Sequence, residues 1–142
     1  MYKSILLPID LNEQSSWEKS IPVAIDMAKT YGASVRVMTV IPDYGKSIVG
    51  SYFPAEFSDK ALANTTAALE KLIAEAFPAD VNVEGTALHG SVYKEVLEVA
   101  DSTGADLIVL TSHRPARSDY LLGPNAARVV RHAKQSVFVV RA

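Results

Sequence analysis

The residues from 106 to 141 combine a buried strand, a basic loop and the start of a helix, which together can bind an anion. Leu107–Leu110 is a continuous apolar run, long enough for a strand buried on both faces. A polar, basic stretch follows, and Gly123 then opens a helix predicted over Pro124–Lys134. The first N–H groups of a helix have no partner within it and carry partial positive charge. This arrangement is typical of phosphate-binding sites.

Individual residues of this stretch offer separable contacts to an anion. Ser112, His113 and Arg114 follow the strand end, and the Arg114 guanidinium can make charge-assisted hydrogen bonds to two oxygens. Gly123 lets the backbone approach an anion closely, and Asn125 offers a side-chain amide and a backbone N–H. His113 can equally cap a neighbouring carbonyl group, so its role stays open.

A second group of candidates ends the predicted first strand, Ser4–Ile9. Pro8 cannot donate a hydrogen bond to a sheet ladder, so we expect it at the C-terminal end of that strand. Asp10 follows at the same end. In doubly wound parallel sheets, ligands bind outside the strand C-termini where the strand order reverses. Asp10 could therefore bind a ribose or a base, or the metal of a Mg–nucleotide complex; alternatively, it is a turn residue that caps the next helix.

The elements that position these residues alternate between strands and helices. Apolar runs predict strands, and apolar residues at helical spacing predict helices. The predicted strands are Ser4–Ile9, Ser34–Ile41, Val81–Leu88, Leu107–Leu110 and Val137–Val140. The predicted helices run from a capping box at Ser15 to Gly32, over Asp59–Phe77, over Val92–Asp101 up to Gly104, and over Pro124–Lys134. This order predicts one α/β domain over residues 1–142, with a five-stranded parallel sheet, helices on both faces and right-handed crossovers.

Two details qualify these elements. Pro22 lies inside the first helical pattern, so it either kinks that helix or marks its true first turn. The third strand is rather polar, which places it nearer a sheet edge.

Composition excludes several classes of protein. The chain has 142 residues, of which 49% are hydrophobic, and no cysteine, so disulfides, thiolate catalysis and Cys-ligated metals are ruled out. No segment has the apolar length of a membrane span and no signal pattern is present, so we expect a cytoplasmic protein without a membrane partner. A net charge of −2 argues against a nucleic-acid partner.

The charge is unevenly distributed along the chain. Six Lys or Arg and a single acidic residue, Asp119, lie from Arg114 onward, whereas the rest carries eight basic and fifteen acidic residues. This asymmetry indicates a basic edge around an anionic ligand. The alternative is a basic helix end that meets only solvent.

The obvious enzyme classes fit poorly. The three histidines, His89, His113 and His132, lie far apart and show no metal-ligand spacing, and no G-x-S-x-G nucleophile motif occurs. Phosphoryl transfer needs groups that hold Mg²⁺ and orient a nucleophile, and only Asp10 could serve the metal. This shortage favours binding over turnover.

The segment SHRPARSDYLLGPNAARVVRHAKQSVFVVR resembles the C-terminal signature of the universal stress protein family, most nearly its small single-domain bacterial F type. YKSILLPIDL resembles that family's first strand, and LHGS its third strand and turn. The resemblance implies a Rossmann-like fold of the adenine nucleotide alpha hydrolase type and a dimeric stress-response signalling module that binds ATP, ADP or AMP, with or without Mg²⁺. It makes Val40 a wall for the adenine, which is compatible with a place in the core. The implied contacts are Pro8, Ile9, Asp10, Val40, Leu110, Thr111, Ser112, His113, Arg114, Gly123, Pro124, Asn125 and Ala126.

The phosphate loop departs from the family pattern, which is Gly, two residues, Gly, nine residues, Gly, then Ser or Thr. Thr111 and Arg114 stand at the first two Gly positions, the gap to Gly123 is one residue shorter, and Pro124 replaces the hydroxyl residue. These departures keep two alternatives open. One is a dimeric interaction protein whose vestigial pocket binds no nucleotide; the other is a slow ATPase or autophosphorylating enzyme.

The last strand carries the expected oligomer contact. Ser136–Arg141 is apolar, and a last strand commonly lies at a sheet edge, where it can pair with a copy of itself. The resemblance implies the same two-fold dimer, from which a higher oligomer could be built.

Overall fold

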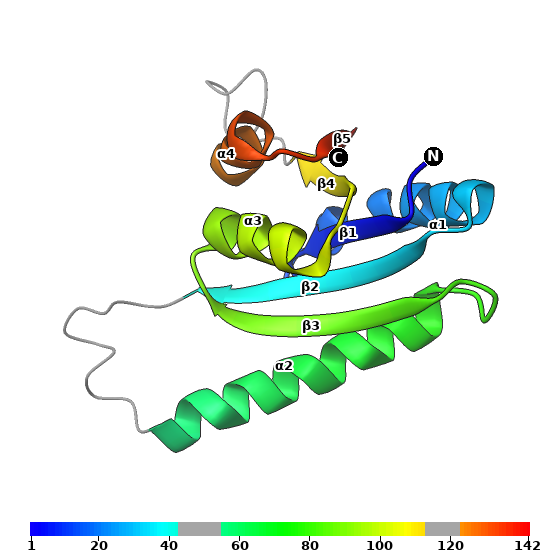
Figure 1. Ribbon diagram of the computed structural model, residues 1–142. Helices are drawn as coiled ribbons and strands as arrows, with labels where there is room; N and C mark the ends of the chain where they lie inside the picture. Colours follow the sequence, from blue (N-terminus) through cyan, green and yellow to red (C-terminus); the bar gives the residue numbers. More distant parts are fainter. Residues whose placement is uncertain (43–54, 113–122) are drawn as a thin grey trace.

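The computed structural model describes residues 1–42, 55–112 and 123–142 and contains a five-stranded parallel sheet (Figure 1). The strands are β1 (Ser4–Ile9), β2 (Ser34–Pro42), β3 (Val83–Gly90), β4 (Leu107–Ser112) and β5 (Ser136–Arg141), in the order β3-β2-β1-β4-β5. The helices are the 3-10 turn η1 (Gln14–Ser16), α1 (Ser20–Tyr31), α2 (Ala55–Ala76), α3 (Val92–Thr103) and α4 (Pro124–His132). The predicted fold class, a parallel α/β sheet with helices on both faces, is confirmed.

Two hydrophobic cores sandwich the sheet. Alternate residues of β1 enter different cores, since neighbouring side chains of a strand point to opposite faces. Ile5 and Leu7 pack with α1 and α2, whereas Leu6 packs with α3 and α4, and all three are 0% exposed. Burying one such side chain contributes roughly 1.5–3 kcal/mol. The central strands are therefore rigid supports for whatever follows their C-terminal ends.

Helix α1 begins later than its sequence pattern predicts. Ser15 and Ser16 resemble a capping box, but the structure forms the short turn η1 there, and α1 starts at Ser20. The Ser16 hydroxyl does not cap a helix, because it bonds the backbone of Asp10 instead. Pro22 therefore lies in the first turn of α1, where a proline is tolerated.

The other helix boundaries lie at or near their predicted positions. Gly32 and Gly104 end α1 and α3 as predicted, with φ of 67° and 70°, a left-handed conformation that favours glycine. Helix α2, predicted from Asp59, already begins at Ala55. Helices α3 and α4 begin at Val92 and Pro124 as predicted, whereas α4 ends at His132, before the predicted Lys134.

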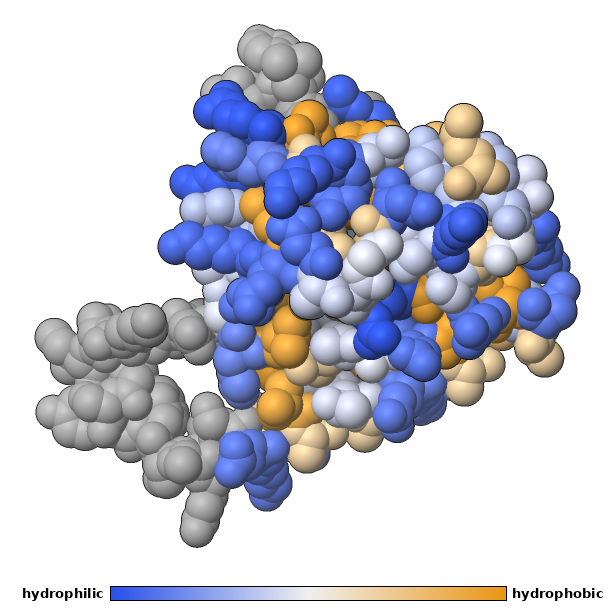
Figure 2. Space-filling model, viewed as in Figure 1, coloured by the Kyte–Doolittle hydropathy of each residue, from blue (hydrophilic) through white to orange (hydrophobic). Residues whose placement is uncertain are grey.

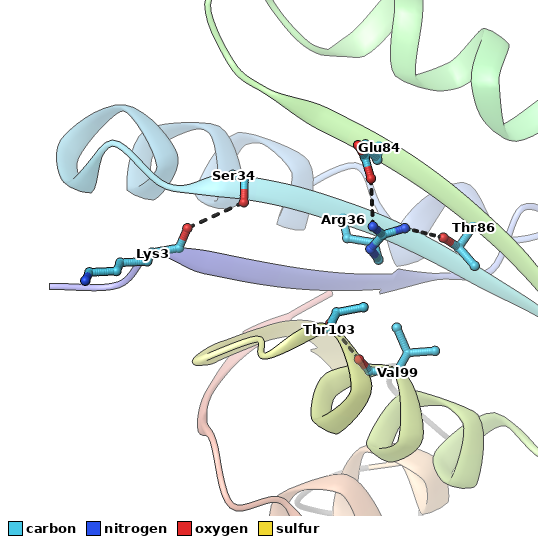
Figure 3. A network of polar contacts seen from close by, with 7 residues as sticks. All are labelled: Lys3, Ser34, Arg36, Glu84, Thr86, Val99 and Thr103. Atoms are coloured by element: carbon cyan, nitrogen blue, oxygen red, sulfur yellow. Dashed lines mark hydrogen bonds and ion pairs between the residues drawn. The ribbon is translucent and has the colours of Figure 1, made fainter.

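The edge pair β2–β3 carries a small polar network (Figure 3). Arg36 donates hydrogen bonds from Nη1 to Thr86 Oγ1 and from Nη2 to Glu84 Oε2, each 2.7 Å long. Both partners come from β3, which lies at the edge as its polar sequence predicted. The Arg36 guanidinium is therefore engaged within the sheet. A partly exposed pair of this kind adds at most about 1 kcal/mol.

Candidate functional site

The strand order reverses between β1 and β4, and the sheet opens there. The chain moves outward from β1 through β2 to β3, then returns to β4 on the other side of β1. The ladder between β1 and β2 extends to the pair Ile9–Thr39, whereas the ladder between β1 and β4 already ends at Leu6–Ile108. The C-terminal ends of β1 and β4 are thus unpaired with each other. Such a switch point is where doubly wound sheets bind ligands.

Pro8 explains why the β1–β4 ladder ends where it does. The Ser4 N–H and carbonyl both bond to Asp106, which shows that the even-numbered residues of β1 direct their backbone groups toward β4. Leu6 follows in that row and makes the last pair of the ladder. The N–H donor after it would belong to position 8, and proline has no N–H. Pro8 is the penultimate residue of β1, as its sequence context predicted. It therefore ends the pairing and opens the switch point.

Three candidate residues lie level with one another at this edge. Ile9 pairs with Thr39, so Asp10 and Val40 stand one step further along β1 and β2. Continuing the β1–β4 register by four residues from its last pair places Ser112 at the level of Asp10. The register therefore places Asp10, which follows β1, at the same edge of the sheet as Val40 of β2 and Ser112 of β4.

The two faces of the sheet divide the remaining strand candidates. Val40 and Leu110 belong to the core under α3 and α4, and alternation places Pro8 on that face. Ile9 is buried in the opposite core beneath α1. Thr111 points the same way as Ile9, because its hydroxyl donates to the Ser16 carbonyl at 2.9 Å. The side chains of Ile9 and Thr111 therefore point away from a ligand on the α3/α4 face.

Asp10 is held in a tight turn with an exposed carboxylate. The Asn12 N–H donates to Asp10 Oδ1 at 2.9 Å, so the side chain closes an Asx turn. The turn-residue interpretation of Asp10 is thus part of its structure. Within the described residues Oδ2 accepts no hydrogen bond, which leaves one carboxylate oxygen available for a hydroxyl group or a metal.

The N-terminus of α4 supplies the anion-binding element. Gly123 is its N-cap, Pro124 its first residue, and no side chain caps it. Ala127 donates to the Gly123 carbonyl at 2.9 Å, but the Asn125 and Ala126 N–H groups find no acceptor among the described residues. Pro124 and Asn125 are exposed, and Ala126 is buried against the core. Two backbone donors therefore remain for a ligand.

Gly123 has no conformational reason to be glycine. Its φ of −64° and ψ of 163° are open to any residue. An added Cβ would meet no described atom within 4 Å. The other helix-flanking glycines contrast with it, since Gly32, Gly90 and Gly104 all have positive φ. Among the described residues, the absence of a side chain at position 123 therefore leaves room beside two backbone donors that lack an acceptor.

The basic residues of α4 are partly committed to the fold. Arg128 lies over the Tyr93 ring with its Cζ 4.8 Å from the centroid, which joins α4 to α3. Figure 2 shows hydrophilic side chains gathered over α4 and α3 around smaller hydrophobic areas. The loop candidates His113 and Arg114 lie outside the described residues, so the basic edge expected around an anionic ligand stays a prediction.

Two negative findings apply to the described residues. They contain no group of three or more His, Asp or Glu arranged to hold a metal ion. None of their helices combines the length and apolar character that crossing a membrane requires.

Sequence reasoning missed the residue that organises this edge. Ser16 is 4% exposed and bonds the Asp10 backbone twice: it accepts from Asp10 N at 2.8 Å and donates to Asp10 O at 2.9 Å. Its sequence signal, a serine before Trp17-Glu18, was the same one that predicted a capping box. Its carbonyl group also accepts a hydrogen bond from Thr111, which lies 95 residues away in sequence, so no local pattern indicates this contact.

A five-stranded parallel sheet with a β1–β4 switch point and helices on both faces defines a doubly wound α/β protein. The model of the Universal stress protein family matches residues 1–141. Universal stress protein G of Shigella flexneri and of Escherichia coli O157:H7 is 31% identical over 144 aligned positions, covering 99% of this chain and 100% of the relative. The chain belongs to the universal stress protein family. The family prediction is confirmed, whereas the F-type assignment stays a prediction, because these relatives are of the G type.

Solved structures of the same family share the fold. Universal stress protein UspA from Lactobacillus plantarum superposes with a TM-score of 0.75 at 21% identity and covers 99% of this chain and 98% of its own. A universal stress protein in complex with cAMP has a TM-score of 0.63 at 23% identity, covering 99% and 97%. The Archaeoglobus fulgidus protein in complex with dAMP has a TM-score of 0.58 at 18% identity, covering 97% of each chain. At these identities the similarity establishes the fold.

Proposed function

We propose that this universal stress protein binds an adenine nucleotide, ATP, ADP or AMP, at the β1–β4 edge and acts as a dimeric stress-response signalling module. In this proposal Pro8, Val40 and Leu110 contact the base, and Asp10 binds the ribose. The N-terminus of α4 binds the phosphates, together with Ser112, His113 and Arg114. Mg²⁺ accompanying the nucleotide would find its protein ligand in Asp10.

The observation that carries this proposal is the unexplained glycine at position 123. Gly123 has ordinary dihedral angles, no described atom lies near its position, and the neighbouring N–H groups find no described acceptor; a ligand that approaches the backbone closely fits this arrangement. The complexes of family members with cAMP and dAMP support an adenine nucleotide as that occupant. The exposed Asp10 oxygen at the same sheet edge fits the hydroxyl groups of its sugar.

Titration calorimetry with AMP and ATP tests the proposal directly. We expect micromolar binding of both, with little preference for ATP, because Pro124 lacks the N–H and hydroxyl that a serine would offer to the distal phosphates. Each such charge-assisted bond is worth roughly 1.5–3 kcal/mol, about tenfold or more in affinity. Binding should weaken with added salt, since Arg114 then carries much of the phosphate contact. No heat and no thermal shift at millimolar nucleotide would reject the proposal.

Experiments on the same purified protein also test the two alternative functions. A dimer whose pocket is vestigial would bind neither nucleotide while keeping its fold. A slow ATPase or autophosphorylating enzyme would release phosphate or gain label from ATP during prolonged incubation.

The dimer part of the proposal rests on the exposed edge of β5. This strand pairs with β4 on one side and ends the sheet on the other, and its Phe138 is 41% exposed. An unpaired apolar edge can extend the sheet into a second copy of the chain. We expect light scattering to show a dimer at tens of micromolar, and a monomer there would reject this part.

A proline in β5 provides a sharper test, if its position is chosen from the backbone alternation. Ala142 N–H bonds to Ser112 O, so the even-numbered residues of β5 face β4 and the odd-numbered ones face outward. Val139→Pro should therefore weaken the dimer at least tenfold, because it removes one outward N–H, worth about 1 kcal/mol in each copy. Phe138→Pro removes an inward donor and should destabilise the monomer itself. Equal effects of the two prolines on dimerisation would contradict pairing through this edge.

A further inference from the structure

A cluster of hydroxyl groups joins the end of β4 to the turn that follows β1. The Ser16 carbonyl accepts two hydrogen bonds, from Thr111 Oγ1 at 2.9 Å and from Ser20 Oγ at 3.0 Å. Ser16 and Ser20 are 4% and 0% exposed, so these groups are largely shielded from water. Buried hydroxyl groups with satisfied partners fix the geometry of the backbone that they bond.

The cluster acts on Asp10 through Ser16. The Ser16 hydroxyl closes a ring with the N–H and the carbonyl of Asp10, and Glu13 N–H donates to that same carbonyl at 3.0 Å. The orientation of the Asp10 carboxylate is therefore set by a turn whose far side is tied to Thr111. A displacement of Ser16 would be transmitted to Asp10 through these two short bonds.

This tie lies where the sheet itself provides none. The β1–β4 ladder ends at Leu6–Ile108, below the level of Asp10. Beyond that pair, the Thr111–Ser16 bond is the one hydrogen bond in the described residues that joins β4 to the segment following β1. Its length therefore helps to set the width of the opening between the two strand ends.

We propose that Thr111 is a positioning residue of the nucleotide site, which orients Asp10 through Ser16 and fixes the opening between β1 and β4. The proposal rests on the proposed function. It also assigns a role to the threonine that stands where the family pattern has its first glycine. The Thr111 side chain points to the α1 side of the sheet, away from Pro8, Val40 and Leu110, so it takes no space from a ligand on their face.

The test compares three single variants with the parent protein. Thr111→Val removes the hydroxyl at nearly constant shape, and Thr111→Ser keeps it. Thr66→Val is the matched control, since Thr66 Oγ1 donates to a backbone carbonyl, that of Leu62, at 2.8 Å within α2. The readouts are the dissociation constant for AMP by calorimetry and the hydrogen-exchange rates of the Asp10, Asn12 and Glu13 amides.

We expect Thr111→Val to weaken AMP binding roughly three- to tenfold, the equivalent of one hydrogen bond, and to accelerate exchange of the three amides. Thr111→Ser should restore both readouts to within about twofold of the parent, and Thr66→Val should change neither beyond that margin. Unchanged AMP binding by Thr111→Val would overturn the proposal, as would an equal loss in Thr111→Ser. A parent protein that binds no AMP rejects the proposed function instead. In that case the exchange rates still decide whether Thr111 holds the Asp10 turn.

Discussion

A valine at position 123 should abolish measurable nucleotide binding while the protein stays folded. Gly123 has dihedral angles that valine also adopts, and no described atom lies within 4 Å of the added Cβ. The branched side chain would instead fill the space beside the Asn125 and Ala126 N–H groups. Losing two charge-assisted hydrogen bonds of roughly 1.5–3 kcal/mol each would lower the affinity for AMP by about a hundredfold or more.

The control for this prediction comes from another helix start. Gly123 is the N-cap of α4, and replacing an N-cap glycine by an aliphatic residue can itself cost on the order of 1 kcal/mol. Ser91, the N-cap of α3, also makes no side-chain capping bond and has an extended backbone. Ser91→Val should therefore show a similar fall in melting temperature without loss of AMP binding. Gly123→Ala should bind with intermediate affinity, because its side chain fills less of the space.

Calorimetry and thermal unfolding on the same preparations separate the two effects. A Gly123→Val protein that binds AMP as the parent does would show that the α4 N-terminus is not at the phosphates. A variant that fails to fold would leave Gly123→Ala to decide, since its added methyl group meets nothing in the described structure.

The architecture was predictable because the strands and helix ends carry strong local signals. Leu107–Leu110 is apolar without interruption and forms the first four residues of β4, buried on both faces. Gly104 ends α3 because left-handed backbone favours glycine wherever it occurs. Pro8 was placed at the end of β1 by the missing N–H alone. Such features depend on a residue and its near neighbours, so a single sequence contains them.

The site was less predictable because its geometry depends on distant partners. Ser16 has the local context of a helix cap, yet its hydroxyl bonds the Asp10 backbone and its carbonyl accepts from Thr111. Since that last contact joins residues 95 positions apart, no local pattern reveals it. Thr111 stands where the family pattern has a glycine, which seemed to argue against nucleotide binding, because the sequence does not show where its side chain points. The direction of its side chain removes that objection.

An alanine at position 90 should be the most destabilising small substitution at any glycine that flanks a helix. Gly90 ends β3 with φ of 146°, a region that residues with a side chain rarely adopt. A Cβ there would also lie 2.6 Å from Glu95 Oε1 and 2.9 Å from Glu95 Cγ. Backbone strain of this kind costs on the order of 1–3 kcal/mol, and the close contact adds to it. Urea unfolding measures the sum.

Two further variants separate the strain from the contact. Gly104→Ala places a Cβ at φ of 70° with nothing within 4 Å, so it should cost only the smaller left-handed penalty of about 1 kcal/mol. In a double-mutant cycle, Glu95→Ala should recover the steric part of the Gly90→Ala effect and leave the backbone part. Because β2 and β1 both lie between β3 and β4 in the sheet, AMP affinity should be unchanged wherever Gly90→Ala remains folded. A Gly90→Ala protein as stable as Gly104→Ala would mean that the β3–α3 turn relaxes to a conformation without positive φ.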